Sequence, residues 1–408
     1  MNKKWQLLPL CNVATITMGL SPEGSTYNND GIGVPLLNGP TEFGPINPEC
    51  TIFTTDSKRE CLPGDLIFCV RGSTTGRMNW ADQVYSLGRG VCAISGETIA
   101  ETKYIKYCLD IFLPALLKVA GGSTMPNLNK DDIADFKIPY SQDSKEIAAI
   151  LSTYDDLIEN NIRRIALLEK MAEEVYREWF VRLRFPGYAQ VPVHQGVPEG
   201  WVIMPADDAF NFTGGGTPSK EEKRFWESGD INWYTPTDIT AAEGIFLSSS
   251  GLKCTEEGLA NSSARLFPAY SLMMTSRATI GAIGINTNQA CTNQGFITCI
   301  PNENFPLTFL YFWLKSNKSY FEALSTGSTF LELIKSKFRK IEIIKPPHKI
   351  VEAYNSVTLP MFRMIETLLE DNRNLKNTRD KLLSRLLSGK LDVENLDIRF
   401  PLGMREMG

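Results

Sequence analysis

The sequence predicts an α+β protein in which two mixed α/β globules are joined by two long antiparallel coiled-coil helices. Three observations carry this prediction. Two long stretches repeat apolar residues every 3.5 positions, much of the chain is written twice, and a run rich in Pro and Gly separates the copies. The 408 residues exceed one ordinary hydrophobic core, so two domains are expected beside the helices. The duplication gives the expected fold an internal pseudo-two-fold symmetry.

The chain is expected to divide into six segments. In order, they are a first globule (1–140), a long central helix (141–184), a linker (185–200), a second globule (201–345), a second long helix (346–391) and a C-terminal tail (392–408). The linker, FPGYAQVPVHQGVPEG, is marked by Pro and Gly, which interrupt regular structure. Pro346-Pro347 closes the second globule in the same way.

The first globule contains motifs that return in the second. Trp5 and Gly19 have the same spacing as Trp201 and Gly215, and the apolar strand 66–70 ends on Arg71 as 272–276 ends on Arg277. Further matches in the same order are 31–37 with 230–236, Gly90 with Gly295, 122–124 with 327–329, and 185–186 with 400–401. Each match is weak alone. Their shared order indicates a unit of roughly 200 residues written twice, each a globule followed by a helix.

The central helix is predicted by its composition and period. Residues 145–184 contain neither Gly nor Pro, and at 1.5 Å per residue they would form a rod of roughly 60 Å. Its seam is Ile147, Leu151, Tyr154, Ile158, Asn161, Ile165, Leu168, Ala172, Val175 and Trp179. Such a seam needs a partner helix.

The second helix supplies that partner. Its seam is Ile365, Leu368, Asn372, Leu375, Arg379, Leu382 and Leu386, and Pro360 is expected to kink this rod or to mark where its regular part begins. Each seam contains one Asn, Asn161 in the first and Asn372 in the second. A polar residue at such a position commonly fixes the register of a helix pair. The alternative is that both side chains are merely solvated. Antiparallel packing would hold one globule at each end of a shared shaft, as a two-part target on duplex DNA requires.

Composition excludes several classes of protein. No uninterrupted apolar run reaches the roughly 18 residues of a membrane span, and the N-terminus lacks the apolar core of a signal peptide. Nine cysteines form no CxxC pair and only two histidines could assist them, so a zinc site is not expected. This pattern favours a reduced, cytoplasmic protein. The net charge of −5 means that any DNA contact must come from a local basic face.

No catalytic site is predicted. A phosphate-binding GxxxxGK[ST] loop is absent, and 214–216 lacks the context of a dinucleotide fingerprint. Asp207-Asp208 with 221–223 could imitate a nuclease centre built on Asp207, Glu221 and Lys223, but this cluster occurs once in a duplicated chain. The sequence therefore favours a non-catalytic protein without its own cofactor. A self-contained nuclease and a two-headed protein scaffold remain as alternatives.

The remaining chemistry is that of nucleic-acid readout. Arginine can grip guanine bidentately, whereas hydroxyls and backbone amides suit phosphate. The candidates in the first globule are Arg71, Ser73, Thr74, Arg77, Arg89, Ser123, Thr124, Asn127 and Lys130, and those in the second are Ser276, Arg277, Thr279, Asn293, Gln294, Ser328, Thr329, Lys335 and Lys337. A solvated surface loop is the alternative for any one of them. Their recurrence in both halves favours a shared binding face.

The organisation resembles the specificity (S) subunits of Type I restriction–modification enzymes. The resemblance rests on the two globules, the helices 147–180 and 365–391, the strand-turn INWYTPTDI and the endings Val175–Phe180 and Leu386–Gly389. It implies two target-recognition domains that each read half of a split DNA sequence, with the helices setting the gap. It also implies docking of two methyltransferase (M) subunits and of restriction (R) subunits, with S-adenosylmethionine, ATP and Mg²⁺ bound by those partners.

Overall fold

The chain forms two compact units whose boundaries fall inside both long helices. A computed structural model describes residues 5–120, 126–326 and 331–404. Unit 1 comprises 1–160 with 372–408, and unit 2 comprises 161–371. The helices are α3 (Ser144–Tyr176), continued by a π-helical turn at Arg177–Val181, and α10 (His348–Leu387), which runs through Pro360 without a break. Each globule therefore shares a core with halves of both helices, and not only with the helix that follows it.

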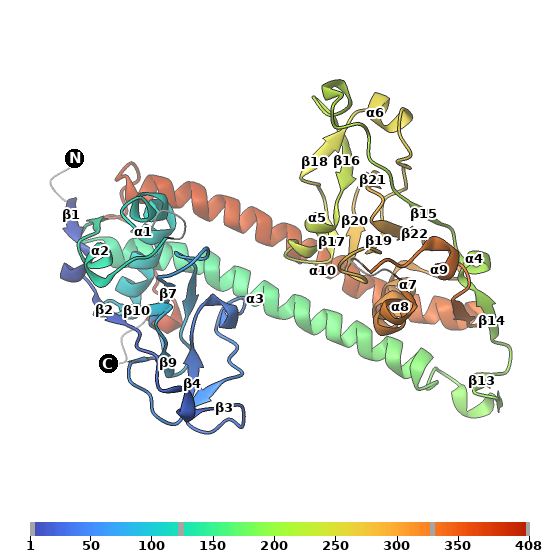
Figure 1. Ribbon diagram of the computed structural model, residues 1–408, viewed down its shortest axis with the longest axis horizontal. Helices are drawn as coiled ribbons and strands as arrows, with labels where there is room; N and C mark the ends of the chain where they lie inside the picture. The colour runs from blue at the N-terminus through green and yellow to red at the C-terminus, as the bar shows by residue number, and fades with distance from the viewer. Residues whose placement is uncertain (1–4, 121–125, 327–330, 405–408) are drawn as a thin grey trace. The chain divides into compact units, whose positions relative to one another are not determined.

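Unit 1 is built around an antiparallel four-stranded sheet, a mixed five-stranded sheet and a short strand pair. Its strands are β1 (Gln6–Pro9), β2 (Thr15–Met18), β3 (Tyr27–Asn28), β4 (Val34–Leu37), β5 (Phe53–Thr54), β6 (Glu60–Cys61), β7 (Leu66–Cys69), β8 (Met78–Trp80), β9 (Tyr85–Leu87), β10 (Val91–Ser95) and β11 (Lys137–Tyr140). Their orders are β2-β10-β7-β8, β3-β5-β4-β9-β6 and β1-β11. Helices α1 (Ile99–Leu117) and α2 (Lys130–Ala134) complete the globule (Figure 1).

Unit 2 repeats this plan. Its strands are β14 (Val202–Pro205), β15 (Phe212–Gly214), β16 (Ile231–Tyr234), β17 (Phe246–Leu247), β18 (Leu252–Cys254), β19 (Leu272–Thr275), β20 (Ile283–Asn286), β21 (Ala290–Thr292), β22 (Phe296–Cys299) and β23 (Glu342–Lys345). Their orders are β15-β22-β19-β20-β17, β18-β16-β21 and β14-β23. The helices are α4 (Ala206–Ala209), α5 (Pro236–Thr240), α6 (Glu256–Ala260), α7 (Leu307–Ser316), α8 (Lys318–Leu324) and α9 (Lys335–Phe338).

Strand pairing confirms the duplication and corrects one alignment. In unit 1, β10 pairs with β7 through Val91 and Cys69, and in unit 2 β22 pairs with β19 through Phe296 and Thr275. The parallel pairs β4–β9 and β16–β21 also correspond. Leu36 pairs with Ser86, and Trp233 pairs with Cys291, which is the equivalent of Ser86, so Leu36 and Trp233 are equivalent positions. The sequence alignment of 31–37 with 230–236 was two residues out of step, because cross-strand partners rather than similar letters define equivalent positions.

The two long helices run antiparallel within each unit, as predicted. In unit 1, Ile147 near the start of α3 shares a core with Leu386 near the end of α10. In unit 2, Tyr176 near the end of α3 contacts Tyr354 near the start of α10, with ring centroids 6.4 Å apart. Asn161 and Asn372 are only 9% and 5% exposed, which contradicts the alternative that they are solvated.

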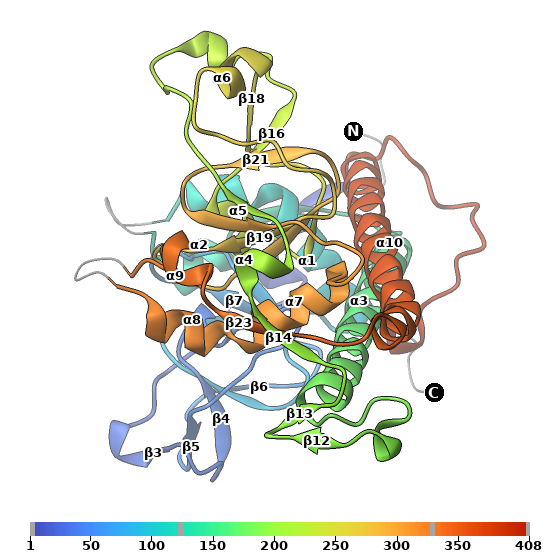
Figure 2. The ribbon, with the colours of Figure 1, turned by 90° about the vertical axis from the view of Figure 1, so that its right-hand side faces the viewer.

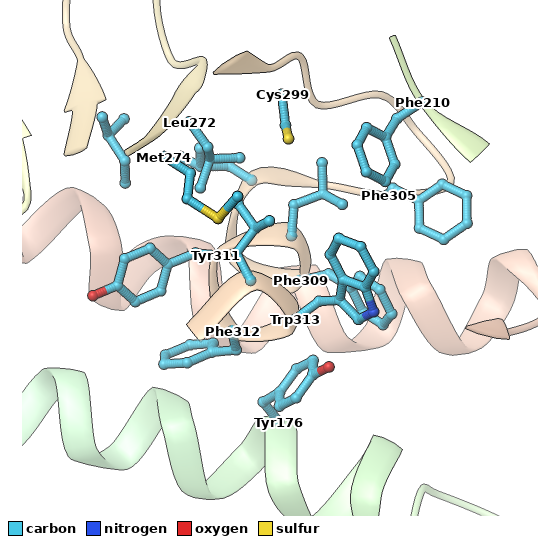
Figure 3. Packing of buried hydrophobic residues seen from close by; sticks show 14 of the residues in the cluster. Tyr176, Phe210, Leu272, Met274, Cys299, Phe305, Phe309, Tyr311, Phe312 and Trp313 are labelled. Atoms are coloured by element: carbon cyan, nitrogen blue, oxygen red, sulfur yellow. The ribbon is translucent and has the colours of Figure 1, made fainter. Parts of the chain in front are cut away.

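The core of unit 2 lies where α7 is enclosed between its main sheet and the long helices (Figure 3). Phe309, Phe312 and Trp313 project from α7, and the ring of Tyr176 on α3 lies 5.7 Å from that of Phe312. Leu272 and Met274 of β19 cover the opposite side of α7. Large aromatic side chains bury more apolar surface than most other residues, and this burial stabilises the packing of the globule on its helices.

The Pro- and Gly-rich linker forms a small hairpin. β12 (Val193–His194) pairs with β13 (Val197–Pro198) beside the end of α3 (Figures 1 and 2). Its two-residue turn, Gln195-Gly196, has positive φ at both positions, at 52° and 82°. Such a turn matches the twist of a two-residue hairpin. The linker is therefore an ordered connection from α3 into unit 2.

Candidate nucleic-acid interface

In unit 1 the candidate side chains gather where β7 and β10 meet two loops. We call residues 70–77, between β7 and β8, loop A. The amide of Val70 donates to Gly90 O (2.9 Å), and Leu128 N donates to Val70 O (3.0 Å). Arg71 also forms a β-bridge with Asn127. These long-range backbone bonds bring Arg71, Arg89 and Asn127, which are far apart in the sequence, to one place on the surface.

Loop A is held in a defined shape by glycines and a buried threonine. Gly72 and Gly76 have φ values of 86° and 96°, a left-handed region that suits glycine. The Thr75 hydroxyl donates to Gly72 O (2.7 Å) and Pro126 O (3.0 Å), so this side chain supports the loop from inside. Ser73 and Arg71 are exposed. Loop A therefore has a defined conformation, and we call this loop, together with its backbone bonds to Gly90 and Leu128, the mount of unit 1.

Unit 2 builds the same mount from the same backbone bonds. We call residues 276–282, between β19 and β20, loop B. Ser276 N donates to Gly295 O (2.8 Å), Leu333 N donates to Ser276 O (2.9 Å), and Arg277 forms a β-bridge with Glu332. Ala278 takes the place of Gly72 and keeps a positive φ of 59°, although it is not glycine. The backbone geometry is thus preserved where the residue type is not.

Different side chains stand on the two mounts. Asn127 of unit 1 corresponds to Glu332 of unit 2, and Glu332 Oε1 accepts a 2.8 Å hydrogen bond from Arg277 Nε. The exposed Arg89 corresponds to Gln294, whose Oε1 accepts from the Thr217 hydroxyl at 2.8 Å. Glu332 was not among the residues predicted from the sequence, because its position opposite Arg277 depends on a β-bridge between distant segments. The order of the repeats was the signal that could have found it.

Several other candidates have structural roles. Ser276 is 3% exposed, so its hydroxyl does not lie on the surface. Lys337 Nζ donates to Leu324 O (2.6 Å), and Asn293 Oδ1 accepts from Gly295 N (2.9 Å). Arg77 lies over the ring of Phe43, 6.0 Å from its centroid. The bond to Gly295 uses the side-chain oxygen of Asn293 and does not involve its side-chain nitrogen.

The remaining candidates lie at the margins of the two faces. Thr74, Thr279, Lys130 and Lys335 are on or beside the loops, and Thr279 and both lysines are exposed. Burial, with a smaller contribution from Arg339, lowers the pKa of Lys335 from its ordinary value. Ser123, Thr124, Ser328 and Thr329 lie outside the described residues.

The nuclease alternative gains no support from the geometry. Asp207 lies on α4, where its Oδ1 faces Arg339 Nε at 3.5 Å, whereas Glu221 and Lys223 are in the exposed stretch before Phe225. Among the described residues, no group of three His, Cys, Asp or Glu side chains could hold a metal ion. Nor does that part of the chain contain a helix long and apolar enough to cross a membrane.

Comparison with known proteins identifies the family. The sequence model of the Type I restriction modification DNA specificity domain matches residues 2–170 and 198–354, which is most of the chain and includes both faces. The chain belongs to this family. The sequence model matches two ranges of the chain, and one of the two mounts lies in each of them.

Individual relatives agree with this assignment. The Type I restriction enzyme MjaIX specificity subunit of Methanocaldococcus jannaschii is 34% identical over 182 residues, 44% of this chain and 42% of that protein. This match covers less than half of either chain. The HindI specificity subunit of Haemophilus influenzae is 24% identical over 73% of this chain and 76% of its own length. The crystal structure of a Type I S subunit from M. genitalium has the same fold, with a TM-score of 0.61 at 18% identity over 95% of this chain and 97% of that one.

Proposed function

We propose that this chain is the non-catalytic DNA-specificity subunit of a Type I restriction–modification enzyme. In this role each unit reads one half of a split DNA target. The observation that carries the proposal is the duplicated mount, in which matching backbone bonds present different polar side chains in a chain of the specificity-domain family. Mounts that share their backbone bonds but present different side chains suit two half-sites that differ in sequence.

The remaining candidates divide by chemistry into readers of bases and holders of phosphate. Arg71, Arg89, Arg277 and Gln294 have the planar groups that pair with base edges. Ser73, Thr74, Thr279, Lys130 and Lys335 suit phosphate oxygens, as do Ser123, Thr124, Ser328 and Thr329. Because the chain has a net charge of −5, we expect partner subunits to supply further phosphate contacts.

The proposed partners are two methyltransferase subunits and, in a restricting complex, restriction subunits. Adenine methylation from S-adenosylmethionine, and ATP- and Mg²⁺-dependent cleavage, would then take place on those partners. The complex would act on cytoplasmic DNA, where all nine cysteines would remain the free thiols of the structure. Asn161 and Asn372 are proposed to fix the register of the helix pair.

The direct test is to express the chain with its methyltransferase and to sequence the methylated adenines of the host DNA. A split motif that disappears when this chain is deleted is expected. Methyltransferase that co-purifies without any such motif would favour the scaffold alternative. DNA cleavage by the purified chain with Mg²⁺ alone, lost in a Lys223→Ala variant, would favour the nuclease.

A second test concerns the spacer. Four residues inserted after Asn160 would lengthen α3 by about one turn, and four inserted after Asp371 would lengthen α10 equally. Both insertions lie at the boundary between the units. The added length is about 6 Å, close to two base-pair steps of about 3.4 Å. We expect the tolerated gap between half-sites to lengthen by about that amount. An unchanged gap would rule out the helices as the spacer.

A further inference from the structure

The pairing of Arg277 with Glu332 has no counterpart in unit 1, where Asn127 occupies the place of Glu332. The bond joins Arg277 Nε to Glu332 Oε1 at 2.8 Å and leaves the two terminal nitrogens of the guanidinium outside it. Both side chains remain open to a ligand, at 44% and 36% exposure. A guanidinium held through Nε presents its far edge in one orientation, which is the edge that pairs with guanine O6 and N7.

Glu332 is itself fixed by its backbone. Its amide donates to Thr326 O (3.0 Å) and its carbonyl accepts from Thr326 N (3.1 Å), while the same residue bridges to Arg277. On the other side, Ala278 N donates to Leu331 O (3.1 Å) and locks the backbone directly after Arg277. The ion pair therefore stands on two rigid segments, and little side-chain freedom remains to be lost when a ligand binds.

The charge of Glu332 discriminates between the two parts of DNA that an arginine can contact. A carboxylate beside the guanidinium repels a phosphate, which carries the same sign of charge, and cancels much of the attraction that a lone arginine would exert. Guanine O6 and N7 are uncharged acceptors, so the carboxylate does not repel them in this way. Asn127 is neutral and leaves the full charge of Arg71 available to a phosphate.

We infer that Arg277 reads a guanine in the half-site bound by unit 2, with Glu332 as the positioning residue that holds its guanidinium and turns it away from phosphate. This inference rests on the proposed function of the chain. It also makes the two half-sites chemically unequal. In unit 1, the residue equivalent to Arg277 retains its attraction for the DNA backbone.

The test uses the chain assembled with its methyltransferase subunits and duplexes that carry the methylated motif or a single base-pair change in it. Affinity is measured for each duplex across a salt series. For Arg277→Gln we expect discrimination at one guanine of one half-site to fall about tenfold or more, with the slope of log affinity against log salt unchanged. Glu332→Asn, which copies unit 1, should weaken the same discrimination and steepen the slope by up to about one phosphate contact.

Two controls separate readout from folding. Lys315→Gln removes another exposed cation of unit 2, one that pairs with Glu173 at 2.7 Å away from loop B, and it should change neither quantity. The reciprocal variant Asn127→Glu should make the slope shallower, because a carboxylate beside Arg71 would repel the nearby phosphate. Thermal melting of each variant checks that it is folded.

Two outcomes would overturn the inference. If Arg277→Gln weakens binding to every duplex equally and lowers the salt slope by about one, Arg277 holds a phosphate. If it changes neither affinity nor discrimination, loop B does not touch the DNA. Failure of the proposed function looks different, because the wild-type complex would then methylate no split motif at all.

Discussion

A polar cluster in unit 1 should anchor its globule to the helix pair. Tyr107 of α1 donates its hydroxyl proton to Asp155 Oδ2 on α3 at 2.5 Å, and Arg379 of α10 donates to Asp155 Oδ1 at 2.5 Å. Arg379 and Asp155 have side-chain exposures of 19% and 31%. Burial, followed by the charge of Asp155, raises the pKa of Tyr107 well above its ordinary value, so this group remains a donor. One carboxylate thus joins three helices.

The variant Asp155→Asn keeps the shape of the side chain and removes its charge. Tyr107 and Arg379 donate to different oxygens of Asp155, and an amide replaces one of these oxygens by an NH2 group that cannot accept, so one of the two bonds is lost and the carboxylate charge with it. Hydrogen bonds to charged groups contribute about 1.5–3 kcal/mol each, and solvent at this partly exposed cluster reduces that gain. We expect unfolding of unit 1 to cost about 2 kcal/mol less, which lowers its melting temperature by about 4–8 °C.

The assay is thermal melting combined with hydrogen exchange of α1 peptides, which reports on unit 1 alone. The double variant of Asp155→Asn with Arg379→Met should be less destabilised than the sum of the single variants by about 1–2 kcal/mol, because the two residues share one interaction. Lys58→Ala is the control, since its ion pair with Asp56 is exposed to solvent and its loss should leave the melting temperature unchanged. Asp155→Asn within about 0.5 kcal/mol of wild type would refute the anchoring role.

Three further predictions concern backbone geometry and pH. Ala278→Gly should stabilise unit 2 by about 0.5–1 kcal/mol in urea unfolding, since its φ of 59° strains any side chain, whereas Gly72→Ala should destabilise unit 1. Gly215→Ala should cost about 2 kcal/mol or more in the same assay, because a Cβ there would lie 2.0 Å from a carbonyl oxygen, while Gly24→Ala, with nothing within 4 Å, should be close to neutral. Partial burial of the Asp110 side chain, which stays 31% exposed, raises its pKa above the ordinary value of 3.8 despite the opposing charge of Lys106, so ionisation of this group disfavours folding. The stability of wild type relative to Asp110→Asn should therefore fall as pH rises from below 3.8 through the raised folded pKa, and a flat difference across that range would contradict this reasoning.

The sequence by itself determined the elements that depend on local pattern. The 3.5-residue seams predicted helices at 141–184 and 346–391, and the structure has them at Ser144–Tyr176, with a π-helical turn to Val181, and at His348–Leu387. Helix formation depends on residues three and four positions apart, so a single stretch of sequence contains the information. The order of repeated motifs predicted two similar globules for the same reason, since each motif is local.

The tertiary structure alone decided which residues face each other across the interface. Glu332 was not among the candidates, and Ser276 was, although the first meets Arg277 and the second is buried. A β-bridge joins residues more than fifty positions apart, and no local period records its register. The same limit applies to the units, because each core takes half of both long helices. Sequence fixes what a segment can form, whereas long-range packing selects its partners and so determines which side chains reach the surface together.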